Sequence, residues 1–164
     1  MSASIIILKK IESFSYLDIL AQVKTAAENA NFHCIYVNTY FDSDNEFQDL
    51  DGTISEVNID LFKENHQNGI HTRQCTFNIR RPTEFSYDSF SWLINKSDYY
   101  WALDLQDLGG DYEFALKFLS CYFQNNENDY LWFDDADWYY TANEIINIGK
   151  QTYNCDWVYR NIMR

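Results

Sequence analysis

The first forty residues combine two apolar runs with one amphipathic segment between them. Ile5–Leu8 is an uninterrupted apolar run that Lys9 and Lys10 end, and this pattern predicts a strand. Apolar residues then recur at helical spacing over Tyr16–Ala30, behind a serine that fits the first position of a capping box. His33–Tyr40 follows directly and has the composition of a second strand. The chain therefore begins with strand, helix and strand.

The middle of the chain is less regular. Phe41–Gly52 is acidic and ends in Asp-Gly, a turn signal, so we expect a loop there. Thr53–Phe62 and Ile70–Arg81 alternate apolar and polar residues, which predicts two strands that pair as a hairpin across the polar turn His66–Gly69. Ser86–Asn95 places its large apolar residues on one face and predicts a short helix.

The last third of the chain contains the most regular patterns. Tyr99–Leu105 and Asp129–Phe133 are apolar and aromatic, and each predicts a strand. Tyr112–Phe123 is apolar nearly all round, which indicates a helix buried on more than one side. Ala142–Lys150 is a predicted helix opened by a Thr-x-x-Glu capping box. The closing segment, Asn154–Arg164, retains large aromatic residues, so we expect it to pack back on the body.

This order of elements predicts the fold class. We expect residues 1–164 to form a single α+β domain, with a mainly antiparallel sheet and helices packed on one face. Such a sheet leaves its other face available. The aromatic residues on the strands at Tyr99–Leu105 and Tyr130–Phe133 are typical of a partly exposed face.

The charge of the chain narrows the class of partner. Twenty-five Asp and Glu residues against 12 Lys and Arg give a formal net charge of −13. This balance argues against nucleic-acid binding and against docking on anionic lipid, because both require clustered basic residues. An acidic balance keeps a protein soluble, and it also attracts a basic partner. Aromatic residues make up 18% of the chain, more than one small core needs, and Tyr and Trp are enriched in binding surfaces.

The cysteines and the N-terminus indicate a reduced, cytoplasmic protein. The four cysteines are spread singly along the chain, without the close pairs that a zinc site or a dense disulfide framework needs. The apolar run near the N-terminus is four residues long and precedes its lysines. A signal peptide has its basic residues before a longer apolar run, so both the length and the order are wrong for one. The run is also too short to span a membrane.

Neither acidic segment fits a metal site or a catalytic site. The segment "DSDNEFQDLDG" resembles a calcium loop, but Phe47 occupies the position of the obligatory glycine and the final glutamate is missing. Asp134, Asp135 and Asp137 lie in a region with one base, Lys117, and would repel the phosphate that accompanies magnesium. The sequence also has no nucleophile or phosphate-loop motif. We therefore expect no metal, no cofactor and no enzyme.

Partner binding remains as the best use of these residues. The segment "WFDDADWYY" supplies carboxylates for electrostatic steering beside rigid aromatic contact area, and the segment around Phe41 does the same. Because neither segment can bury unpaired carboxylates, both are expected at the surface. The candidate partner-binding residues are Asp134, Asp135, Asp137, Trp138 and Tyr139, with Asp42, Asp44 and Glu46 as a second patch.

These segments also carry a resemblance. "YLWFDDADWYYTANEI" and the closing "DWVYRN" resemble C-terminal segments of bacterial immunity proteins from contact-dependent growth inhibition and related polymorphic toxin systems. The resemblance implies a cytoplasmic protein that binds a cognate toxin domain, often a basic nuclease, and blocks its active site or a neighbouring surface.

Two alternatives stay open. One is a carboxylate-dependent hydrolase for a neutral substrate such as a glycoside, using acids near Trp132 or Trp138. The other is an acidic mimic of nucleic acid, which would need regularly spaced carboxylates and fewer aromatic residues.

Overall fold

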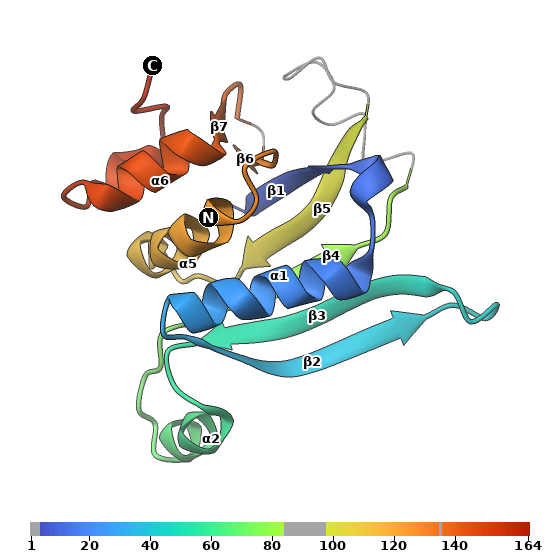
Figure 1. The fold of residues 1–164 in the computed structure, drawn as a ribbon. Coiled ribbons are helices and arrows are strands. Elements are labelled where there is room, and N and C mark those ends of the chain that lie inside the picture. The colour runs from blue at the N-terminus through green and yellow to red at the C-terminus, as the bar shows by residue number, and fades with distance from the viewer. Residues whose placement is uncertain (1–3, 84–97, 135) are drawn as a thin grey trace.

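The computed structural model describes residues 4–83, 98–134 and 136–164, and it has an antiparallel sheet as its centre (Figure 1). Seven strands follow the spatial order β2-β3-β4-β5-β1-β6-β7, and every neighbouring pair is antiparallel. The strands are β1 (Ile5–Lys10), β2 (His33–Phe41), β3 (Phe47–Ser55), β4 (Gln74–Arg80), β5 (Tyr99–Gln106), β6 (Tyr130–Phe133) and β7 (Tyr139–Thr141). The predicted α+β class with an antiparallel sheet is confirmed.

Three helices form a layer over one face of this sheet (Figure 1). Helix α1 (Tyr16–Asn29) packs on β2 and β4 and lies against α5 (Tyr112–Gln124), which in turn contacts α6 (Ala142–Lys150). Helix α2 (Ile59–Gln67) stands apart from this layer, beyond the end of β3, and has no buried residue. Two 3-10 turns, η1 (Ile11–Ser13) and η2 (Cys155–Val158), complete the secondary structure of the described ranges.

One continuous row of directly opposed residues describes the register of the sheet. This row crosses all seven strands through Asn38, Asp51, Asn78, Asp104, Ile6, Trp132 and Tyr139. Successive residues of a strand point to opposite faces, so these seven side chains share one face. Lys9 bonds to Tyr122 of α5 and therefore marks the opposite, helix-covered face of β1. The row thus lies on the other face, which no helix of the described residues covers and which we call the helix-free face.

The buried side chains form one continuous core around β1 and α5. Ile5–Leu8 is completely buried, and β1 lies inside the sheet with β5 on one side and β6 on the other. Eight of the 13 residues of α5 are buried, as its apolar periphery predicts. Helix α1 begins where expected, because the Ser15 hydroxyl accepts the backbone N–H of Asp18 at 3.3 Å.

The interpretation of residues 41–62 is wrong in two places. The expected loop Phe41–Gly52 is mostly strand, since β3 begins at Phe47 and Gly52 lies in its middle. The expected strand Thr53–Phe62 ends at Ser55, and Asn58 then caps α2 by accepting the N–H of Leu61 at 2.9 Å. β3 and β4 do pair, as predicted for these two segments, but α2 connects them.

Gly52 is a glycine because of packing across the sheet. A Cβ atom at this position would lie 2.5 Å from two ring carbons of Phe77 on β4. The glycine therefore accommodates a neighbouring ring, and it does not make a turn.

The C-terminal segment packs back on the body, as expected. Trp157 in η2 is completely buried, and the Tyr140 hydroxyl bonds to the carbonyls of Trp157 (3.0 Å) and Arg160 (2.9 Å). The helix expected at Ser86–Asn95 lies outside the described residues. Among the helices that are described, none combines the length and the apolar character needed to cross a membrane.

Candidate functional site

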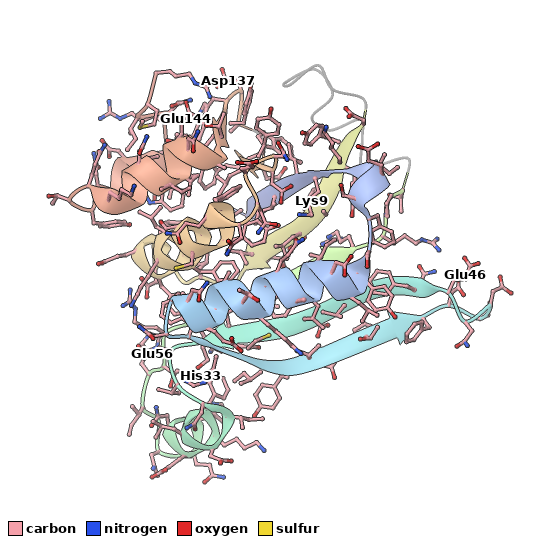
Figure 2. All side chains as sticks on the ribbon, viewed as in Figure 1. Lys9, His33, Glu46, Glu56, Asp137 and Glu144 are labelled. Atoms are coloured by element: carbon pink, nitrogen blue, oxygen red, sulfur yellow. The ribbon has the colours of Figure 1, made fainter. Side chains whose placement is uncertain are left out.

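The two acidic patches lie on hairpin turns at opposite corners of the sheet. Asp42, Asp44 and Glu46 are on the β2–β3 turn, and Asp134 and Asp137 are on the β6–β7 turn, whereas Asp135 is outside the described residues. β2 and β7 form the two edges of the sheet, about 29 Å apart at the usual strand spacing. The turns also face opposite ends of β1, and Figure 2 shows Glu46 far from Asp137. The structure therefore does not join the patches into one surface.

The β2–β3 hairpin projects beyond the body of the molecule, and we call residues Asn38–Asp51 the acidic arm (Figure 1). Its four residues Asn38–Phe41 on β2 are all exposed, so both faces of this edge reach solvent. The arm contains five carboxylates and no lysine, arginine or histidine. These are Asp42, Asp44, Glu46, Asp49 and Asp51.

The turn of the acidic arm is held by Asp42. One carboxylate oxygen accepts the backbone N–H groups of Asp44 (2.9 Å) and Glu46 (3.0 Å), and the other accepts the Gln48 side-chain amide at 2.9 Å. The hydrogen bond from the Glu46 N–H is the main reason that the pKa of Asp42 lies below its usual value, and Arg81, 3.8 Å away, adds to it. Asp42 is thus occupied within the turn, while Asp44 and Glu46 face solvent.

Large aromatic side chains are exposed along the β2 edge. Tyr36, Tyr40 and Phe41 are 42%, 47% and 50% exposed. Phe41 contacts the ring of Tyr16, at the start of α1, edge to face at 6.5 Å, and Tyr16 stacks on Phe47 at 4.0 Å. These contacts anchor the root of the arm and leave its outer rings in solvent. Exposed aromatic residues beside carboxylates are typical of protein-binding surfaces.

Tyr40 also belongs to a polar cluster on the helix-free face. Its hydroxyl bonds to Asp51, and this bond together with the charge of Asp51 raises the pKa of Tyr40. The Asn38 side-chain amide donates to the same carboxylate at 3.3 Å. Asp49 is opposite Tyr40 in the register and is exposed. The arm therefore presents an ordered tyrosine and two carboxylates on one face.

The β6–β7 hairpin differs because its aromatic residues are packed. Trp138 contacts the rings of Phe133 and Tyr140, each at 5.2 Å, and is only partly exposed. Trp132 is 2% exposed, and its indole N–H donates to the carbonyl of Ala136 at 2.9 Å. A ring buried in this way offers no platform for a sugar.

The end of the chain covers a further part of this hairpin. The Arg164 guanidinium lies 5.0 Å from the centre of the Tyr139 ring and pairs with Glu144 at 2.8 Å. Asp134 and Asp137 are exposed as expected, but Trp138 and Tyr139 stabilise the hairpin more than they face solvent.

The helix-free face contains a buried carboxylate, Asp104, that the sequence did not indicate. It is completely buried and accepts four hydrogen bonds at 2.7–3.0 Å. Two of the donors, the Arg80 guanidinium and the Trp101 indole, also contact each other at 5.2 Å in a cation–π arrangement. The donors are Asn78, Arg80, Trp101 and Gln106. All of the acceptor capacity of Asp104 is used internally, so it organises the sheet surface.

A second buried charge lies beneath the helix layer, next to a hollow of about 510 Å³. The Lys9 ammonium donates to Asp129 (2.6 Å), Gln22 (3.0 Å) and Tyr122 (3.1 Å). Burial raises the pKa of Tyr122 well above its usual value; burial also raises the pKa of Asp129, and the ammonium of Lys9 opposes that rise. All three protons of Lys9 have acceptors, which fits a structural role.

The described residues were compared with the requirements of a metal site and of a reactive cysteine. No group of three or more His, Cys, Asp or Glu side chains there is arranged to hold a metal ion. Burial raises the pKa of Cys34 to about 11 and also raises that of Cys75. A thiol with a raised pKa is a poor nucleophile at neutral pH.

Comparison with known protein families, curated proteins and solved structures finds no match to this chain.

The sequence indicates aromatic contact area around Phe41, but the candidate contact residues of that segment are Asp42, Asp44 and Glu46 alone. Tyr36, Tyr40 and Phe41 were not among the predicted contact residues, and neither were Asp49 and Asp51. The available signal was the run of aromatic and polar residues that follows Ile35 on β2. That signal has meaning only when β2 is known to be an edge strand.

Proposed function

We propose that this protein binds and neutralises a basic protein through the acidic arm, as an immunity protein of a polymorphic toxin system would. The observation that carries the proposal is the exposed edge of β2, where Tyr36, Tyr40 and Phe41 stand beside five carboxylates. Asp42 pairs with Arg81 at 3.8 Å, and the other four have no ion pair within the described residues. Aromatic rings supply contact area at low entropic cost, and the carboxylates steer a basic partner toward them.

Charge and exposure together favour this function over the alternatives. A net charge of −13 repels nucleic acid and attracts a basic protein. A nucleic-acid mimic would need carboxylates without large exposed rings along the same edge. A glycoside hydrolase would need two carboxylates in a cleft with an open aromatic platform, and Trp132 is buried while Trp138 is packed. The cytoplasm is the compartment that this proposal implies.

The partner is sought beside the gene of this protein. The protein encoded next to it, or its C-terminal domain, is produced and titrated with this protein in a calorimeter. The proposal predicts a tight one-to-one complex and protection of cells that express the neighbouring domain. A neighbour that neither binds nor harms cells would contradict the assignment to a toxin system.

The site is tested by charge reversal with a matched control. The triple variant Asp44→Lys, Glu46→Lys and Asp49→Lys changes exposed carboxylates of the acidic arm and spares Asp42, which holds the turn. We expect a loss of affinity of about 100-fold or more, mostly through slower association at low salt. The double variant Asp134→Lys and Asp137→Lys at the other corner should bind within about threefold of the wild type. The reverse ranking would move the site to the β6–β7 hairpin.

A further inference from the structure

We propose that the acidic arm recognises its partner by strand addition, so that an extended basic segment pairs with the outer edge of β2. This inference rests on the proposed function, and it adds the mode of binding and the chemistry of the bound segment. The segment would carry basic residues at every second position, facing the carboxylates, and apolar residues between them.

The outer edge of β2 is open. β2 is the first strand of the sheet order and pairs with β3 alone, within the ranges that the structure describes. Residues Asn38–Phe41 are exposed in succession, and no helix in those ranges covers them (Figure 1). An edge strand carries a row of N–H and C=O groups that can pair with another chain. Strand addition uses such a row for affinity and side chains for specificity.

The two edges of the sheet differ in how they resist such pairing. β7 is three residues long and runs directly into α6, whose first residue is Ala142. Short edge strands are one common protection against unwanted pairing. β2 has nine residues, without proline or lysine, and its own irregularity lies near Tyr36, where φ is 53° and the register shifts. A second register shift, between Tyr40 and Phe41, places its extra residue, Gln48, on β3. The stretch of β2 after Tyr36 is regular enough to accept a strand.

Charge decides what the edge can accept. Pairing with a second copy would bring two acidic arms together, each with five carboxylates and no base, and like charges on neighbouring strands are unfavourable. A basic segment is attracted instead, because its charges are opposite to those of the arm. An added strand would lie about 10 Å, or two strand spacings, from β3. A lysine or arginine that extends over Tyr40 would cover most of this distance toward Asp49 and Asp51.

The two faces of the arm set the alternation of the bound segment. Asn38, Tyr40, Asp49 and Asp51 share the helix-free face by register. Phe41 points to the other side, where it contacts Tyr16 at the start of α1. Alternate residues of an added strand face these two sides in turn. Basic residues therefore suit the first side and apolar residues the second.

The test uses short peptides as probes and the whole protein. The parent probe alternates lysine and valine; two further versions carry N-methyl groups on every lysine or on every valine, and a fourth replaces lysine by glutamate. Each methylated version keeps the charge and blocks one backbone edge. We expect the parent to bind, to slow amide hydrogen exchange over residues 37–41, and to lose at least about tenfold in affinity in one methylated version. The glutamate peptide should not bind.

Each contrary outcome has a defined meaning. If both methylated peptides bind as well as the parent, attraction between side chains is sufficient and strand addition is wrong. If the parent peptide does not bind, or slows exchange only elsewhere, strand addition is also wrong. In both cases the charge-reversal experiment on the cognate partner still decides the proposed function. If that experiment shows no loss at the acidic arm, the proposed site fails whatever the peptides do.

Discussion

The Lys9 ammonium lies 2.6 Å from the Asp129 carboxylate, and both side chains are almost completely buried beneath the helix layer. The pair joins β1 to the turn before β6, and Tyr122 of α5 donates to the same carboxylate oxygen at 2.8 Å. Removing one partner of a buried pair leaves an uncompensated charge. We expect Lys9→Met to lower the free energy of unfolding by about 3–5 kcal/mol in urea denaturation.

A double-mutant cycle separates the pair from the packing around it. Lys9→Met with Asp129→Leu should cost clearly less than the sum of the two single changes, because the buried charges leave together. The exposed pair Arg160–Asp156 is the control, and Arg160→Ala should cost less than about 0.5 kcal/mol. Additive single costs at Lys9 and Asp129 would contradict the coupling.

Gly52 offers a test of packing across the sheet. Gly52→Ala would place a methyl group against the Phe77 ring, and we expect a loss of about 1–3 kcal/mol in thermal or urea unfolding. Adding Phe77→Leu should make the cost of Gly52→Ala smaller than in the wild-type background. An alanine that costs nothing in either background would contradict the close contact.

Asp111 gives a pH-dependent contribution to stability. It caps α5 through the Phe114 N–H and binds Arg73 at 2.6 and 2.8 Å; the bond from Arg73 is the main reason that the pKa of Asp111 is lowered. A carboxyl with a lowered pKa in the folded state stabilises it above the unfolded-state pKa, about 3.9 for Asp. This contribution is lost as pH falls through the lower, folded-state value.

The variant Asp111→Asn measures that contribution. At pH 7 we expect it to lower the free energy of unfolding by about 1 kcal/mol, and the difference from the wild type should shrink as pH falls below about 4. Urea denaturation at several pH values checks the sign. A difference that grows toward low pH would contradict the lowered pKa.

Asp104 predicts a large effect from a small change. Asp104→Asn keeps the shape of the side chain but removes the charge and turns an N–H₂ group toward two of the four donors. We expect a loss of about 2–4 kcal/mol in the free energy of unfolding and a change in the near-ultraviolet dichroism of Trp101. Asp60→Asn on exposed helix α2 is the control and should cost less than about 0.5 kcal/mol.

Tyr40 tests the aromatic half of the acidic arm. Tyr40→Ser should lower affinity for the cognate partner by about tenfold or more, mostly through faster dissociation, while the protein stays folded. Tyr159, which is 70% exposed near the C-terminus, is the matched control, and Tyr159→Ser should leave affinity unchanged. Equal effects of the two changes would remove Tyr40 from the interface.

The candidate site could be predicted from the sequence only in part. Both acidic segments were expected at the surface because carboxylates without bases cannot be buried. The described carboxylates of the two patches are exposed except Asp42, which is partly buried. The sequence could not rank them. "WFDDADWYY" has more large rings than the arm, but Trp132 pairs with Ile6 and Tyr139 contacts Arg164, both distant in the chain. Trp138 packs on Phe133 and Tyr140 of its own hairpin.

Elements with local signals could be predicted from the amino-acid sequence. Hydrophobic periodicity and capping residues predicted β1, α1, α5 and α6 to within a few residues, and the charge determined the class of partner that we propose. The three-dimensional arrangement was needed to see that Gly52 lies against Phe77, that α2 interrupts the expected hairpin, and that β2 is an edge. These features escape a local pattern because a strand's neighbours and the exposure of its side chains depend on residues far away in the chain.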